Sequence, residues 1–434
     1  MADSIALPVR FAEALKPFYL SQTERNLSAP RYSAKLGFVE QVSLLALMIS
    51  MVALSIDVML PALADIAGDL KAGGANERQY IVTFLFFGMA IGQMLYGPVS
   101  DSTGRKPAIY FGFGLFLIGC LTSIFAVNFE MMLFGRFLQG LGVAGPRIVT
   151  LALIRDQYEG RAMARFVSLV MTVFILVPIL APALGQSILF IGNWHMIFAV
   201  LFGLGLAALI WFALRHEETL VPEKRTKLSL GRTARAIREV FMNRIAFGFT
   251  MVGGFVFSAF LGYLTMSQQI FQDIYGVGDL FAVYFGLLAI AIGMASFVNA
   301  RLVMRLGMRR LAYYALTTLT VLSAGFLVYT LALDGPPPLP VMVGYLMISF
   351  FCLGILFGNC NAMAMEPLGH IAGVAAAVVG SITTFVSMGL GTLIAQMFNG
   401  TVLPLVAAFA VLGAISLLCM FWTLRRTGPE QQHA

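Results

Sequence analysis

Apolar stretches of about 20 residues, long enough to cross a membrane as helices, recur along most of the chain and alternate with short polar segments. Twelve such stretches can be read: 41–61, 80–100, 107–127, 131–153, 166–191, 194–214, 245–270, 280–300, 311–333, 339–365, 371–397 and 401–424. An even number of spans places both ends of the chain on one side. The pattern predicts an all-helical membrane protein with twelve transmembrane helices.

The longest internal polar segment, residues 215–244, divides the spans into six and six. Transporters with internal repeats have such halves and bind substrate near the midplane where the halves meet. The basic loops after the second and eighth spans echo each other, as duplication would produce: Gly104-Arg105-Lys106 and Gly307-Met308-Arg309-Arg310. The sequence therefore predicts an N-terminal arm (1–38), a six-helix half (39–214), a central loop (215–244), a second six-helix half (245–424) and a tail (425–434).

Positive charge is distributed unevenly between the two sides of the predicted bundle. Cytoplasmic loops are enriched in Lys and Arg. Of the 28 such residues, 24 fall on the side that holds both termini. The other four are Lys71, Arg78, Arg136 and Arg147. We therefore expect the arm, the central loop and the tail to be cytoplasmic. The basic pI, near 9.3, then reflects loops that face anionic lipid, and we expect no nucleic-acid partner.

Composition agrees with a membrane protein and disfavours several other functions. Hydrophobic residues make up 59% of the chain and charged residues 11%, against about a quarter charged in soluble domains. Four His, with no acid inside spans two to twelve, offer poor material for an enzyme or a metal site. The chain has no GxxxxGKS/T loop for direct use of ATP. The four cysteines all lie inside spans, so we expect free thiols: Cys120, Cys352, Cys360 and Cys419.

Three ionisable side chains lie well inside the apolar stretches: Asp57, Arg136 and Arg147. A charge at the bilayer centre costs roughly 2.5 to 3.5 kcal/mol, so these residues are the best candidates for function. Asp57 and Arg136 reach similar depth, about four and five residues from the outer ends of their spans. One hypothesis is that Asp57 alternates between a position beside Arg136, which favours proton release, and an apolar position, which favours proton binding. The alternative is a permanent Asp57–Arg136 ion pair that only fixes helix packing.

Arg147 follows Arg136 by eleven residues, so the two side chains project from nearly the same helix face about 16 Å apart. If this face lines a central cavity, anionic or electron-rich neutral substrates are favoured over cations. Alternatively, Arg147 reaches the inner surface or pairs with an acid such as Asp156. Apolar walls with few polar groups suit small ligands, although lipid contact or helix packing is the alternative for each aromatic residue. The expected cavity residues are Arg147, Gln139, Phe84, Phe257 and Tyr263.

The loop after the second span combines glycines with charged residues: Gly97-Pro98-Val99-Ser100-Asp101-Ser102-Thr103-Gly104-Arg105-Lys106-Pro107. Glycine permits a tight turn, Asp101 can approach a helix N-terminus, and the two basic residues can pair with acids or lipid phosphates. We expect a charged hairpin that acts as an inner gate; a simple basic turn would not explain the glycines and Asp101. The loop resembles the G-x-x-x-D-x-x-G-R-K signature of the major facilitator superfamily, and the resemblance covers essentially the whole chain.

Three further segments extend this resemblance. Arg136-Phe137-Leu138-Gln139-Gly140 is similar to the family's fourth-span motif, whose arginine is associated with proton coupling. Residues 178–185 resemble the fifth-span antiporter motif through Pro178, Pro182 and Gly185, although Ala181 and Gln186 stand where the general motif has glycine. Residues 57–63 and 361–364 resemble the bicyclomycin and chloramphenicol resistance (Bcr/CflA) subfamily of drug:proton antiporters. Arg147 belongs to none of these motifs.

The resemblance implies a proton-coupled multidrug exporter in the bacterial inner membrane, with Asp57 and Arg136 coupling transport to protons. Its substrates would be small amphipathic drugs, and its coupling ion would be the proton. Its biological role would be antibiotic resistance. We expect a monomer surrounded by lipid, without a cofactor. The main alternative is a dedicated metabolite or organic-anion carrier of the same fold. A passive channel is a further alternative and would show no proton flux that depends on Asp57.

Overall fold

A computed structural model of the chain describes residues 36–74 and 76–425. Most of the predicted arm and all but one residue of the predicted tail lie outside the described residues. The first half contains α3 (Phe38–Asp57), α5 (Tyr80–Thr103), α6 (Arg105–Ile124), α7 (Phe129–Gln157), α8 (Gly160–Ile191) and α9 (Trp194–Arg215). The second contains α11 (Arg244–Gln268), α12 (Phe281–Leu306), α13 (Met308–Leu331), α14 (Leu339–Met365), α15 (Ala372–Gln396) and α16 (Leu403–Leu424).

These twelve long helices confirm the predicted fold class. Length and composition mark 11 candidate membrane spans within the described residues, because α14 and α15 count as one stretch, Leu339–Gln396. The two helices are joined by η7, a 3-10 turn at Glu366–Ile371. Shorter elements occupy the connections: η2 (Leu60–Ala62), α4 (Leu63–Asp69), η3 (Glu77–Gln79), η4 (Pro222–Lys224), α10 (Leu230–Met242), the π-helix η5 (Gln269–Ile274) and η6 (Gly278–Leu280).

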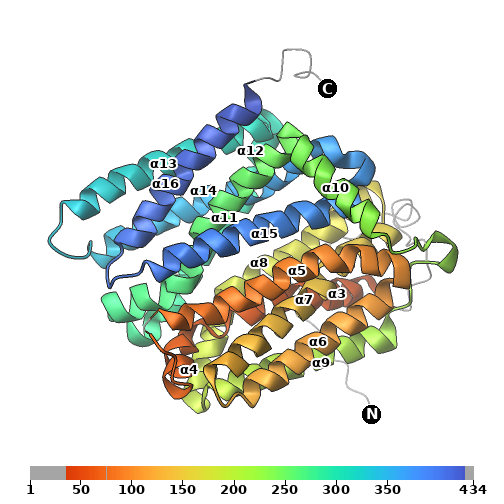
Figure 1. The fold of residues 1–434 in the computed structure, drawn as a ribbon, viewed down its shortest axis with the longest axis horizontal. Helices are drawn as coiled ribbons and strands as arrows, with labels where there is room; N and C mark the ends of the chain where they lie inside the picture. The colour runs from red at the N-terminus through yellow and green to blue at the C-terminus, as the bar shows by residue number, and fades with distance from the viewer. Residues whose placement is uncertain (1–35, 75, 426–434) are drawn as a thin grey trace, which may run out of the picture.

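The two halves pack side by side, with α5 along α15 and α8 along α12 (Figure 1). Ser381 of α15 donates a hydrogen bond to the Ala90 carbonyl of α5 at 2.8 Å. We call the end of the bundle that carries the central loop and α10 the loop end. The opposite end, where α3 gives way to α4, we call the far end. Both ends contribute to the site described below.

Glycines bring the helices of the first half into backbone contact. A Cβ atom at Gly140 of α7 would lie 1.9 Å from the Leu85 carbonyl oxygen of α5. At Gly142, on another side of α7, a Cβ would lie 2.3 Å from the Phe116 backbone nitrogen of α6. Only glycine allows these approaches. They hold α7, which carries Arg136 and Arg147, between α5 and α6.

Two elements differ from the sequence-based prediction. The first span was expected to continue to residue 61, but α3 ends at Asp57 and a 3-10 turn follows. Pro61 has no N–H with which to continue the helical hydrogen bonding back to residue 57. The sequence marks the central loop only as a polar segment, yet the loop contains α10. Ala236 and Val240, four residues apart on one face of α10, are buried where this helix packs on α15 and α11.

Candidate functional site

Asp57 lies at the break between α3 and the 3-10 turn and is only 5% exposed. Its carboxylate has no hydrogen bond or ion pair with any residue that the structure describes. Tyr263, on α11 of the other half, lies within electrostatic range of Asp57. The Tyr263 side chain is fully buried, and its hydroxyl also lacks a hydrogen-bond partner among the described residues. Asp57 and Tyr263 are therefore two polar groups from opposite halves that lie near each other, neither with a hydrogen-bond partner among the described residues.

Arg136 is fully buried but does not contact Asp57. It donates to the Ser55 carbonyl of α3 at 2.7 Å and to the Ile81 carbonyl of α5 at 3.2 Å. A third hydrogen bond goes to the side-chain oxygen of Gln139. All three acceptors are neutral, so the permanent Asp57–Arg136 ion pair, one of the two possibilities left open by the sequence, is absent from this conformation. Arg136 instead ties α3, α5 and α7 together.

Gln139 does not occupy the position expected of a cavity residue. It is fully buried, and its side-chain nitrogen donates to the Gly119 carbonyl at 3.0 Å and to the Ser123 hydroxyl at 2.9 Å. Both partners belong to α6, inside the first half. The helical period places residue 139 about 60° around α7 from residue 136, which directs its side chain toward α6 and away from the second half. Gln139 therefore joins α7 to α6 within the first half.

The fifth-span motif packs directly on the break beside Asp57. A Cβ atom at Gly185 of α8 would lie 1.8 Å from the Val58 carbonyl oxygen. Pro182 is buried, Pro178 is half-buried, and both lie within the continuous helix α8. Gly185 thus lets α8 approach the backbone of the residue that follows the buried aspartate. The motif and Asp57, far apart in sequence, form one structural unit.

Neutral amide side chains join the two halves at the far end. Gln79 donates to Gln269 at 2.5 Å, and Gln269 donates to the side chain of Asn76 at 3.1 Å. Gln396 donates to the side chain of Gln79 at 3.2 Å and to the Asn76 carbonyl at 3.1 Å. We call these four residues the far-end clamp. Because Gln79 and Gln269 are almost inaccessible, this end of the bundle is closed.

Two further contacts secure closure beside the far-end clamp. Gln268 of α11 donates to the Pro61 carbonyl at 3.0 Å, which fastens the break after Asp57 to the second half. Arg78 and Asp273 form an ion pair nearby. Sequence reasoning missed these residues, although Gln and Asn gather at the ends of spans that topology places on one side. That clustering is the signal that could have found them.

Arg147 lies closer to the loop end on α7 and remains partly exposed. Its only polar contact among the described residues is with the sulfur of Met89 on α5, at 3.7 Å. Asp156, the acid suggested as its partner, instead binds Arg105 at 2.8 Å. The pairing of Arg147 with Asp156 is therefore absent. Arg147 and Arg136 both contact α5, as their expected common face requires.

An aromatic cluster extends from α5 into the second half. Phe86 of α5 meets Phe257 of α11 with ring centroids 6.0 Å apart. Phe257 continues to Phe260 and to Phe357 of α14, at 5.7 and 5.5 Å. These last three rings are partly exposed. Tyr263 sits one turn farther along α11, fully buried against Phe350 at 4.7 Å.

Phe84 occupies a different surface from the one expected. Its ring packs against Phe87, which is 36% exposed. Phe87 in turn packs against Phe137 and against Phe385, which is 37% exposed. The set therefore faces outward, as lipid-contacting residues do, and Phe86 is the aromatic side chain of α5 that meets the second half. This result follows the alternative that the sequence left open for each phenylalanine.

At the loop end, Arg105 is the centre of an ionic network. It binds Asp101 at 2.5 Å and Asp156 at 2.8 Å, and its side chain is 4% exposed. The backbone N–H groups of Arg105 and Lys106 both donate to Glu218, at 2.9 and 3.0 Å. Gly104 has φ of +111° and faces Glu218 at a distance that leaves no room for a side chain. The predicted charged hairpin is thus present as a structure, and it also fastens the start of the central loop.

His216 adds a buried neutral group beneath this network. Its backbone carbonyl accepts a hydrogen bond from the Lys106 ammonium at 2.7 Å. Its ring lies 3.3 Å from the Gln157 side chain and stacks on Phe212. Burial lowers the pKa of His216, and the nearby Lys106 acts in the same direction. The ring is therefore uncharged at neutral pH.

The second half repeats part of the loop-end network. Gly307, like Gly104, has a positive φ, here +78°, and directly precedes a helix. Arg309 pairs with Glu366 after α14, as Arg105 pairs with Asp156 at the end of α7. The distance is 3.5 Å and both partners are partly exposed, so this second ion pair is much looser. The echo read from the two loops thus has a structural counterpart.

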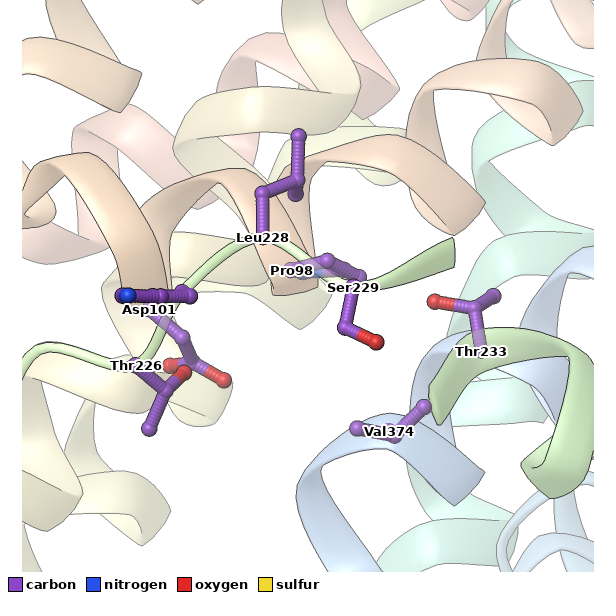
Figure 2. Close-up of a pocket in the computed structure, with 8 residues that line it drawn as sticks. Pro98, Asp101, Thr226, Leu228, Ser229, Thr233 and Val374 are labelled. Carbon is purple, nitrogen blue, oxygen red and sulfur yellow. The ribbon is translucent and has the colours of Figure 1, made fainter. Parts of the chain in front are cut away.

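The central loop runs between the halves at the loop end. The backbone N–H of Thr226 donates to the Asp101 carbonyl at 2.9 Å. Figure 2 shows the following residues, Leu228 and Ser229, passing between Pro98 at the end of α5 and Val374 at the start of α15. A Cβ atom at Gly97 would lie 3.5 Å from the Ala377 Cβ of α15. The hairpin, the central loop and the second half therefore meet at one place.

We expect Asp156→Asn to destabilise the protein by about 1 to 3 kcal/mol, because buried Arg105 loses one of its two carboxylates. Glu366→Gln is the matched control. Its exposed pair with Arg309 is expected to contribute at most about 1 kcal/mol. Thermal unfolding of the two purified variants in detergent, followed by intrinsic fluorescence, compares them directly. Equal shifts of the unfolding midpoint would show that the first pair is no more important than the second.

Comparison with known proteins agrees with this architecture. Residues 45–392 match the family described as Major Facilitator Superfamily. The chain is 31% identical over 384 residues to the MFS-type transporter YdgK of Bacillus subtilis, covering 87% of this chain and 94% of the relative. It is also 31% identical over 384 residues to a bicyclomycin resistance protein homolog of Haemophilus influenzae, covering 86% and 92%. The crystal structure of a D-xylose-proton symporter superposes with a TM-score of 0.65 at 14% identity, covering 90% of this chain and 98% of the symporter.

Proposed function

Because this chain belongs to the Major Facilitator Superfamily, we propose that it is a proton-coupled secondary transporter that exports small amphipathic compounds from the cytoplasm. The observation that carries the proposal is Asp57. This carboxylate is buried at the break after α3, near Tyr263 of the other half, without a hydrogen-bonding partner among the described residues. A group in that position changes its access to water whenever the halves rearrange.

Closure of the far end decides the charge of Asp57 in this mechanism. An ionised carboxylate without a donor is strongly disfavoured away from water, whereas the neutral acid is tolerated. The closed far end therefore holds the proton that Asp57 takes up from outside. Opening toward the other side admits water and allows release. Tyr263, across the interface in the second half and within electrostatic range of Asp57, is our candidate for a hydroxyl donor to the ionised form.

The proposed direction of transport rests on charge and on the relatives. The basic residues of the loop end, Arg105 and Lys106 among them, place that end in the cytoplasm by the preference of cytoplasmic loops for Lys and Arg. The far end then faces outward. A relative whose name refers to bicyclomycin resistance supports drug export as the activity. Arg147 is the observation that favours the alternative, an organic-anion or metabolite carrier.

Proton coupling is tested with inverted vesicles from cells that express the protein. A fluorescent dye reports the pH gradient while chloramphenicol, 1-naphthoate or ethidium is added as neutral, anionic or cationic probe. We expect at least one probe to dissipate the gradient with wild type but not with Asp57→Asn. Asp65→Asn is the control, because Asp65 is exposed and lies eight residues beyond Asp57. It should behave as wild type.

Substrate exchange in proteoliposomes without a pH gradient separates coupling from folding. Asp57→Asn should still exchange labelled for unlabelled probe, since exchange needs the binding site but no net proton movement. If Asp57→Asn dissipates the gradient as wild type does, Asp57 is not the proton carrier. If no probe moves protons in wild type, the result contradicts the drug exporter proposal and favours the alternative, a dedicated metabolite or organic-anion carrier.

A further inference from the structure

Arg147 has no oxygen acceptor among the residues that the structure describes. A guanidinium carries five N–H donors, and its one contact here is a methionine sulfur, which is a weak acceptor. In Arg105 and Arg136, on the same half, all three side-chain nitrogens donate to oxygen atoms. None of the Arg147 nitrogens is among the buried unsatisfied atoms, so its free donors lie on accessible surface.

The accessible side of Arg147 belongs to a stripe of α7 that α5 covers only in part. Helix α5 crosses α7 obliquely and meets Gly145, on the opposite side of α7, through Tyr96. Toward the loop end this crossing leaves the stripe uncovered, and Leu151 on it is 39% exposed. Two turns farther along α7 and about 80° around it, the Arg155 guanidinium lies 3.6 Å from the Cβ position of Gly373 on α15. Arg147 and Arg155 therefore place two positive charges on the part of α7 near the loop end, and Arg155 reaches the second half.

An apolar wall lies next to this positive charge. Met89, which contacts Arg147, stands three residues after Phe86 on α5, and side chains at that spacing share a helix face. Phe86 leads directly to the partly exposed rings of Phe257, Phe260 and Phe357. A cation with free donors thus adjoins an aromatic surface. Asp156, the acid suggested by the sequence as its partner, does not neutralise it, because Asp156 is engaged by Arg105.

We infer that Arg147 binds an anionic group of the substrate, so that the preferred class is an aromatic or other apolar compound with one carboxylate or a similar anion. This inference rests on the proposed transport function and names its substrate class. Arginine binds a carboxylate through two parallel hydrogen bonds, which are stronger than bonds between neutral groups. A cationic compound meets an uncompensated positive charge at the same place. Arg155 draws the anion toward Arg147 from the loop end.

Wild-type protein alone gives the first test. We compare binding of 1-naphthoate, 1-naphthamide and 1-naphthylmethylammonium to protein in nanodiscs, using radiolabelled naphthoate and competition by the other two. The three compounds share one ring system and differ in charge. Naphthoate is expected to bind about tenfold more tightly than naphthamide, a difference typical of one charge-assisted contact, and the cation least well. Equal or tighter binding of the amide or the cation overturns the inference, as does failure of all three to bind.

Variants assign the preference to the residue. In Arg147→Met, naphthoate and naphthamide should bind with about equal affinity. The affinity for naphthamide should stay within about twofold of the wild-type value, and this unchanged affinity would show that the site is still folded. Arg147→Lys keeps the charge but not the paired geometry, so an intermediate preference is expected. Arg161→Met removes an exposed loop-end arginine and should change nothing. An unchanged preference in Arg147→Met, or an equal loss for all three compounds, overturns the assignment.

Failure of this inference can be told apart from failure of the transport proposal. Binding in nanodiscs needs no gradient, so Asp57→Asn should retain the naphthoate preference. A lost preference in Arg147→Met together with normal proton flux in Asp57→Asn upholds the anion site and overturns proton coupling through Asp57. An unchanged naphthoate preference in Arg147→Met, together with lost proton flux in Asp57→Asn, overturns the anion site and upholds proton coupling through Asp57.

Discussion

Gly185→Ala is expected to reduce export by about tenfold or more, even though it adds a single methyl group. The added Cβ would lie 1.8 Å from the Val58 carbonyl oxygen, so α8 and the break after Asp57 must separate. Overpacking of this kind typically costs about 1 to 3 kcal/mol. The neighbouring far-end contacts, such as Gln268 with the Pro61 carbonyl, depend on the position of the same segment. Closure of the far end should therefore fail.

Accessibility and transport are measured together for this variant. Ala62→Cys, at a fully buried position in the segment after Asp57, reports far-end opening by its reaction with an impermeant maleimide. Labelling should rise in the Gly185→Ala background. Gly203→Ala is the control, since a Cβ at Gly203 meets nothing within 4 Å. Wild-type export and unchanged labelling in Gly185→Ala would show that α8 tolerates the displacement and that this contact does not govern closure.

Arg136→Lys is expected to destabilise the first half by about 3 kcal/mol or more, although it preserves the charge. The guanidinium spans the Ser55 carbonyl, the Ile81 carbonyl and Gln139, and a single ammonium cannot reach all three. Each lost bond to a charged donor is worth about 1.5 to 3 kcal/mol. Ser55 belongs to the last turn of α3, where the helix itself leaves carbonyls without donors.

The same substitution at Arg147 is the internal control. Arg147→Lys removes no bond to a protein oxygen, so its thermal unfolding midpoint in detergent should match wild type. Arg136→Lys should unfold at a clearly lower temperature and lose transport with it. If Arg136→Lys is as stable as wild type but no longer moves protons, Arg136 acts in coupling, as its motif suggests, and its structural bonds are secondary.

Hydropathy predicted the helices well because a bilayer demands long, uninterrupted apolar segments. The span read at 339–365 coincides with α14, and most others differ by a few residues at their ends. Two local features differ from the hydropathy prediction, because they depend on backbone chemistry and on side-chain packing. Pro61 ends the first helical region early, and the paired apolar positions Ala236 and Val240 organise α10 within a charged loop. Patterns of charge alone could not reveal an amphipathic helix there.

The candidate site was predictable only as far as charge reveals it. Asp57, Arg136 and Arg147 stood out because ionisable groups are rare at such depth. Their partners did not, since a backbone carbonyl such as that of Ser55 carries no sequence signal. Gln139 was misplaced because motif membership does not specify the direction of a side chain. Tyr263 was named as a cavity residue, but its proximity to Asp57 depends on how the two halves meet.

The far-end clamp is built from carboxamide side chains. Carboxamides carry no charge, so they neither titrate with pH nor interact strongly with salt ions. Gln79, Gln269, Asn76 and Gln396 hold the two halves through hydrogen bonds between neutral groups. In the proposed orientation this end meets the surroundings of the cell, whose acidity and salinity the cell does not control. The ionic network around Arg105 lies at the other end, in the buffered interior. Apart from the Arg78–Asp273 ion pair beside it, the seal against the outside is thus made of groups whose hydrogen bonds depend on neither pH nor salt.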